Sequence, residues 1–264
     1  MRSNEISRRY RPLPEVKAPG TFGKIIHVMM HVRPAVWLLL TLILSAIVIT
    51  VLPGHIWSSL LRSMRAHKFV VGMLLVFCLV TLSLLWAAGQ RIDVFVFMLI
   101  NKRGKRPKWL DQFMLGFTQL GNGIFAFILT AVFYALNFHR LAYEILLGTL
   151  SLWLIVEFVK VLMQRKRPYS FLPDIRILGR RERGHSFPSG HTSQAFFLAS
   201  LLSHYFFTGM YLSVILYAIA VMIGITRIYV GMHYPRDVLG GVILGTTWGI
   251  IAISLNPALL MRWF

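Results

Sequence analysis

Long apolar segments without a single Asp, Glu, Lys or Arg recur along the chain, and they constrain its fold more than any other feature. Six such segments occur, and one further segment, 141–160, is equally apolar but contains Glu144, Glu157 and Lys160. A bilayer core about 30 Å thick needs around 20 apolar residues as a helix, and backbone groups inside lipid must bond internally. We therefore predict an all-α polytopic membrane bundle with seven spanning helices. Six of them are the uncharged segments 35–53, 69–88, 122–138, 192–208, 211–226 and 238–255.

Composition excludes several other classes of protein. Of the 264 residues, 56% are hydrophobic and 14% are charged, and the formal net charge is +19. So high an apolar content excludes a disordered chain. It also argues against a nucleic-acid-binding protein, because the basic residues would share a surface with lipid-facing segments. A single cysteine excludes an intramolecular disulfide and a cysteine-based metal site.

The chain divides into a basic tail, residues 1–34, and one transmembrane domain, residues 35–264. Between two of the spans, residues 89–121 combine Lys and Arg with apolar clusters, which indicates an interfacial amphipathic helix and a basic loop. Near the C-terminus, Gly241, Gly245 and Gly249 recur at every fourth position. This spacing predicts a face for close helix packing.

The basic residues also predict an orientation in the membrane. With seven spans, 23 of the 28 Lys and Arg residues fall on one side. By the positive-inside rule that side is cytoplasmic, and it carries the polar loops of a multi-pass protein of the bacterial inner membrane. A phosphate-binding site would be basic on either side, so an outward-facing arrangement stays open.

Three polar clusters are predicted to meet at this same face. The first contains Lys160 and Arg167, seven residues apart, which on a continuous helix ended by Pro168 would face one pocket. In the second, Ser189 is a suitable N-cap for a helix that starts at Gly190 and His191, and such a helix start attracts anions.

The third cluster runs from Arg227 through His233 to Asp237. Pro235 suits the first turn of the last helix. Asp237 is then expected to accept a hydrogen bond from one ring nitrogen of His233, which would leave the other nitrogen as a nucleophile. Two histidines, several cations, one carboxylate and an anion-binding helix start fit the chemistry of phosphoryl transfer.

Together the three clusters resemble the signature of the type 2 phosphatidic acid phosphatase (PAP2) superfamily, with a six-helix core at about 69–255 and the motifs within 160–237. The resemblance implies that His233 is the nucleophile, that Asp237 orients it and that His191 protonates the leaving oxygen. It implies no metal or other cofactor, and phosphate contacts from Lys160, Arg167, Ser189, Gly190 and Arg227. Two features depart from the family pattern: Thr226 stands where serine is common, and an extra N-terminal span precedes the core.

The expected activity is therefore that of a metal-independent, membrane-embedded lipid phosphatase acting through a phosphohistidine. Its expected partners are the bilayer and a lipid phosphate. The substrate stays open among a prenyl diphosphate such as undecaprenyl diphosphate, phosphatidic acid, phosphatidylglycerol phosphate and lipid A. A lipid phosphotransferase with the same intermediate, or a transporter that only binds phosphate headgroups, are the alternatives. We predict Glu157, three residues before Lys160, to be its charge partner.

Overall fold

The computed structural model describes residue 43 and residues 67–101, 106–173, 175–206 and 210–260. The predicted basic tail, and the first predicted span apart from Ile43, lie outside the described residues. Within the described part the elements are helices, and no strand occurs there, so the prediction of an all-α fold is confirmed.

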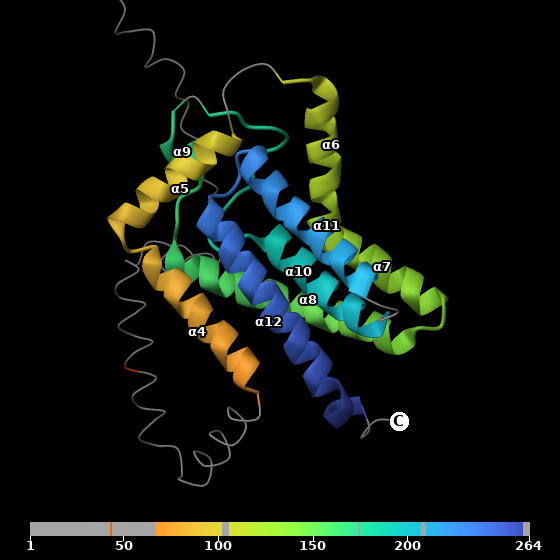
Figure 1. The fold of residues 1–264 in the computed structure, drawn as a ribbon. Helices are drawn as coiled ribbons and strands as arrows, with labels where there is room; N and C mark the ends of the chain where they lie inside the picture. Colours follow the sequence, from red (N-terminus) through yellow and green to blue (C-terminus); the bar gives the residue numbers. More distant parts are fainter. Residues whose placement is uncertain (1–42, 44–66, 102–105, 174, 207–209, 261–264) are drawn as a thin grey trace, which may run out of the picture.

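Most helices follow one another with short connections, but the long segment between Phe171 and Gly190 contains no helix in its described residues (Figure 1). A short 3₁₀ helix, η2, spans Gln119–Gly121. The α-helices are α4 (Lys68–Ser83), α5 (Ala87–Ile100), α6 (Lys108–Thr118), α7 (Gly123–Ala135), α8 (His139–Met163), α9 (Pro168–Phe171), α10 (Gly190–Tyr205), α11 (Met210–Tyr229) and α12 (Pro235–Leu260).

Within the described residues, fewer helices qualify as simple membrane spans than the six that the sequence predicted there. In the described part, three stretches are long and apolar enough: His139–Phe171, Met210–Tyr229 and Pro235–Ser254. Two bent pairs, α4 with α5 and α6–η2 with α7, raise the number to five if each pair is one span. The predicted span 192–208 corresponds to α10, which has only 16 residues. The predicted span 69–88 is interrupted after Ser83, where the chain turns by 93° into α5.

Two helices, α5 and α6, occupy the region 89–121, where one amphipathic helix was predicted. The bend before α5 is held by Gln90, whose Nε2 donates to the carbonyl of Leu84 at 2.9 Å. It is also held from the far end of the chain, because Arg236 Nη1 donates to the carbonyl of Ser83 at 2.5 Å. The first bond closes the bend, and the second fastens the end of α4 to the start of α12.

Helix α10 is the centre of the bundle and contacts α8, α11 and α12 (Figure 1). The residues from Thr192 to Leu201 are all buried. Against them lies the glycine stripe of α12: a Cβ on Gly245 would lie 2.1 Å from the carbonyl oxygen of Ser193, and one on Gly241 would lie 2.8 Å from that of Ser189. The predicted close packing is thus confirmed, and it brings the start of α10 beside the start of α12.

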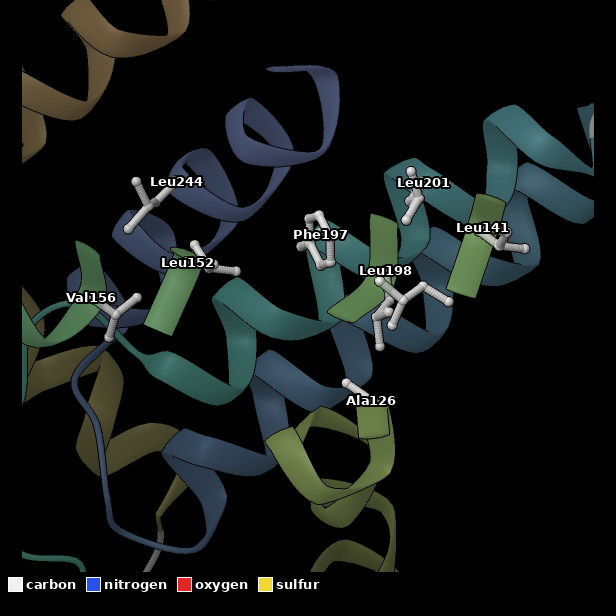
Figure 2. Packing of buried hydrophobic residues seen from close by; sticks show 9 residues of the cluster. Ala126, Leu141, Leu152, Val156, Phe197, Leu198, Leu201 and Leu244 are labelled. Carbon is white, nitrogen blue, oxygen red and sulfur yellow. The ribbon is translucent and has the colours of Figure 1, made fainter. Parts of the chain in front are cut away.

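The largest apolar cluster lies between α7, α8, α10 and α12. Figure 2 shows where its side chains lie on these helices, with Phe197, Leu198 and Leu201 on α10. Phe197 packs over Gly148 of α8, where a Cβ would lie 2.2 Å from the ring. Lipid tails are as apolar as these side chains, so close packing rather than exclusion of water holds such helices together.

Candidate active site

The three predicted clusters meet at one end of the bundle. The N–H of Ser189 donates to the carbonyl of Asp237 at 3.0 Å, which joins the second cluster to the third. Arg167 Nη1 lies 3.3 Å from His233 Nε2, which joins the first to the third. A cavity of about 1030 Å³ opens here, and its lining includes Lys160 and His191.

His233 lies in the turn between α11 and α12 and is 1% exposed. Its Nδ1 is 2.8 Å from the backbone carbonyl of Ser186. A carbonyl oxygen only accepts, so this contact places the ring proton on Nδ1 and leaves the Nε2 lone pair free to react. Nε2 faces Arg167 and lies 3.8 Å from Glu182 Oε2.

Asp237 lies within ion-pair distance of His233 but does not form the predicted hydrogen bond with it. Its Oδ2 lies 3.7 Å from His233 Nδ1, which is too long for a hydrogen bond. Instead Oδ2 accepts from the N–H of Tyr234 at 2.8 Å and from Ser186 Oγ at 2.5 Å. Asp237 is the third residue of α12, so it reaches back to the residue before the helix as in a capping box. The ring nitrogen therefore pairs with the Ser186 carbonyl.

Two buried guanidinium groups, Arg167 and Arg227, grip the same carboxylate. Arg167 Nη1 binds Glu182 Oε2 at 2.9 Å, and Arg227 Nη2 binds Glu182 Oε1. Arg227 also donates to Thr118 Oγ1 at 3.1 Å, which ties it to the end of α6. Both arginines thus converge on one small anion.

Glu182 is a residue of the site that the sequence reasoning missed. It belongs to the segment between α9 and α10, and its side chain is 30% exposed. Its Oε1 lies 3.9 Å from His191 Nδ1. Burial alone would raise the pKa of this carboxyl, but the contact with His233 and the positive charge of Arg227 outweigh it and hold the pKa far below its ordinary value. The only signal in the sequence is a single acid within a run of arginines, shortly before Ser189.

The start of α10 is placed as predicted, but Ser189 does not cap it. Ser189 occupies the N-cap position without a side-chain capping bond, and its Oγ instead accepts from Thr192 Oγ1 at 2.9 Å. Gly190 and His191 form the first turn and line the cavity. Backbone N–H groups of a first helical turn have no partner within the helix, so they suit an anion.

Lys160 and Arg167 reach the same cavity from separate elements, not from one helix. Helix α8 ends at Met163, and Gln164 adopts a left-handed conformation with φ of 46°. Pro168 begins the short α9 and does not end α8. Lys160 Nζ binds Glu157 Oε1 at 2.7 Å, which confirms the predicted pair. It lies 4.0 Å from where a Cβ on Gly190 would be.

The cavity is strongly basic. Its lining contains two acids, Glu157 and Glu182. In the described part of the chain, no group of three His, Cys, Asp or Glu side chains lies together as a metal site would need. The cations in the lining are Lys160, Arg167, Arg180, Arg181, Arg183 and Arg227.

Comparison with known proteins agrees with this geometry. The sequence model of the PAP2 superfamily matches residues 141–260. Phosphatidylglycerophosphatase B of Bacillus subtilis is 33% identical over 152 residues, which cover 53% of this chain and 72% of that protein. Lipid A 4'-phosphatase of Bacteroides thetaiotaomicron is 31% identical, over 58% of this chain and 72% of that one.

Two solved structures share the fold. The transmembrane PAP2-type phosphatidylglycerolphosphate phosphatase of Bacillus subtilis superposes with a TM-score of 0.64 at 26% identity, over 72% of this chain and 96% of that one. LpxE of Aquifex aeolicus superposes with a TM-score of 0.56 at 32% identity, over 62% of this chain and 95% of that one. The chain therefore belongs to the PAP2 superfamily.

Proposed function

We propose that this chain is an integral membrane phosphatase that removes the phosphate headgroup of a lipid through a covalent phosphohistidine on His233. One observation carries the proposal. His233, His191 and two buried arginines all lie around the carboxylate of Glu182. Like a phosphate group, a carboxylate is a small anion with oxygen acceptors, so the same four groups could surround a phosphate. The relatives named above, both lipid phosphatases, support the same reading.

The proposed reaction has two steps. His233 Nε2 attacks phosphorus, an N–P bond forms, and the P–O bond to the lipid breaks as His191 gives a proton to the leaving oxygen. Water then attacks the phosphorus as His191 takes a proton from it, the P–N bond breaks and returns its electron pair to His233 Nε2, and orthophosphate leaves. The cations of the cavity stabilise the charge on the phosphoryl oxygens in both steps.

The cavity suits a lipid because its lining changes from polar to apolar. From the cations it continues past Val156, Leu152 and Trp153 of α8 to Ile124 and Phe127 of α7. A headgroup held by the arginines would leave its chain along this apolar part. Candidate substrates are a prenyl diphosphate, phosphatidic acid, phosphatidylglycerol phosphate and lipid A; among further relatives is the undecaprenyl-diphosphatase of Sulfolobus acidocaldarius, 30% identical over 38% of this chain and 48% of that one.

We further propose that the reaction needs no metal, since cationic side chains supply the charge that a metal would provide. The excess of Lys and Arg on the loops of this end favours a site that faces the cytoplasm of a bacterial inner membrane. Protease accessibility of the loop that contains Arg180 and Arg181, in sealed vesicles of known orientation, tests the side.

The deciding experiment measures orthophosphate released from a panel of purified lipid phosphates in detergent with a chelator present. We expect release by the natural chain and none by His233→Ala, while the control His204→Ala, at an exposed histidine near the end of α10, keeps activity. Release without any acceptor lipid would count against a phosphotransferase. Equal release by His233→Ala would refute the assignment, and lipid binding without any turnover would favour a transporter.

A further inference from the structure

A buried arginine next to the site, Arg165, links the third cluster to helix α5. Its side chain is 8% exposed. Nη1 binds Asp237 Oδ1 at 2.6 Å, and Nη2 binds Asp93 Oδ2 and also Gln90 Oε1 at 2.9 Å. One guanidinium therefore joins two carboxylates that are 144 residues apart in the sequence, and the planar fork of an arginine fixes both at a defined angle.

Asp93 in turn holds the start of α12. It is 2% exposed, and it accepts from the backbone N–H of Arg236 at 3.0 Å and from Arg236 Nε at 2.7 Å. Asp93 thus binds the residue immediately before Asp237 and also the arginine that binds the Asp237 carboxylate. Two independent contacts from α5 set where that carboxylate lies.

From Asp237 the network reaches His233 through Ser186. Ser186 Oγ donates to Asp237 Oδ2, and the Ser186 carbonyl accepts from His233 Nδ1. Both Ser186 and Asp237 are 0% exposed. Because these groups are buried, solvent does not replace a hydrogen bond that is lost at one end. The loss is therefore transmitted along the network, as in other buried polar networks.

We infer that Asp93 and Arg165 are positioning residues for His233, acting through Asp237 and Ser186, and that α5 is part of the catalytic unit. The inference rests on the proposed role of His233 as nucleophile. The hydrogen-bond partner of an imidazole fixes its tautomer and ring orientation. For metal-bound histidines the loss of such partners typically costs roughly 10-fold to 100-fold in affinity or activity, and we expect a similar loss here. The two arginines that we propose to hold the substrate phosphate, Arg167 and Arg227, bind Glu182 and lie outside this network.

The test compares Asp93→Asn with the control Asp111→Asn. Asp111 also pairs with an arginine, Arg176, but on α6 and outside the network. For Asp93→Asn we expect kcat to fall roughly 10-fold to 100-fold, with KM and inhibition by orthophosphate within about twofold of the natural chain. Asp93→Glu should restore part of kcat, since it returns the charge. A second variant, Ser186→Ala, should lower kcat in the same way even if Asp93→Asn does not fold.

A second readout is independent of turnover. The Nδ1–H of His233 gives a low-field proton NMR signal, assigned by its loss in His233→Ala, and we expect Asp93→Asn to shift it while Asp111→Asn does not. An unshifted signal together with unchanged kcat would overturn the inference, as would an equal loss of kcat in Asp111→Asn. A shifted signal in a chain that releases no phosphate would support the network and refute the proposed function instead.

Discussion

Replacing Glu182 by glutamine should make the protein bind free phosphate more tightly. The carboxylate occupies the space between Arg167 and Arg227 where we place the substrate phosphate, so a phosphate must displace it. Glutamine keeps the shape of the side chain and removes its charge. The guanidinium groups then hold it less firmly, and the anion site is open more of the time.

The contacts allow the size of this effect to be worked out. A hydrogen bond to a charged group contributes about 1.5–3 kcal/mol when it is enclosed. The Glu182 side chain is 30% exposed, and solvent screening lowers the net advantage of the closed state to about 1.4 kcal/mol. The site is then open roughly one time in ten, and apparent affinity falls by that fraction. Removing the competition should tighten phosphate binding about tenfold.

The assay measures inhibition of lipid hydrolysis by orthophosphate for the natural chain, Glu182→Gln and Glu157→Gln. Glu157 is a matched control, because it also lines the cavity and carries the same charge but binds Lys160 away from the two arginines. We expect the inhibition constant to fall about tenfold for Glu182→Gln and to change little for the control. Unchanged or weaker inhibition in Glu182→Gln would refute the competition between Glu182 and phosphate. An equal fall of the inhibition constant in both variants would show that the loss of any negative charge in the cavity has the same effect.

Three further outcomes follow from the packing, the loop and the cavity mouth. Gly245→Ala should lower the free energy of unfolding by about 1–3 kcal/mol because its Cβ meets backbone of α10, whereas Gly72→Ala, with nothing within 4 Å, should leave the melting temperature nearly unchanged. Burial, and then the charges of Arg167 and Lys160, lower the pKa of His185 from its ordinary 6.5, so the unfolded chain binds a proton first as pH falls and stability present above pH 6.5 is lost below it. The melting temperature of His185→Gln should therefore fall less than that of the natural chain when the pH is lowered from about 7.5 to 5.5. An equal fall in both would contradict the pKa shift. Three exposed arginines line the cavity: Arg180, Arg181 and Arg183. Exposed ion pairs contribute up to about 1 kcal/mol each, so changing all three to glutamine should raise KM several-fold more for a lipid with two phosphate groups than for a lipid with one. Equal changes in KM would argue against a contact between these arginines and a second phosphate group.

The helical fold was predictable because uncharged apolar runs specify helices in lipid wherever they occur. The break after Ser83 was not, since Leu84, Leu85 and Trp86 are as apolar as the helix before them. That bend depends on Arg236, which is 153 residues away in the sequence, and a local pattern carries no information about such a contact.

The residues of the site were predictable as a set, but their contacts were not. Spacing placed Asp237 near His233, yet the carboxylate is drawn to the N–H of its own helix start and to Arg165, and a backbone carbonyl takes its place. Likewise Gln164 turns the chain between Lys160 and Arg167, although nothing in its residue type requires a left-handed conformation. Such contacts depend on the path of the loop backbone, which the residue types alone do not specify.

The central claim is that His233 accepts the phosphoryl group, and trapping that intermediate tests it most directly. A lipid phosphate labelled with ³²P is mixed with the natural chain, and the reaction is quenched within its first turnover in alkali, where phosphohistidine survives. The account predicts an acid-labile label on the peptide that contains His233, and no label in the His233→Ala variant. Label on another residue, or phosphate release with no labelled protein at any time, would contradict it.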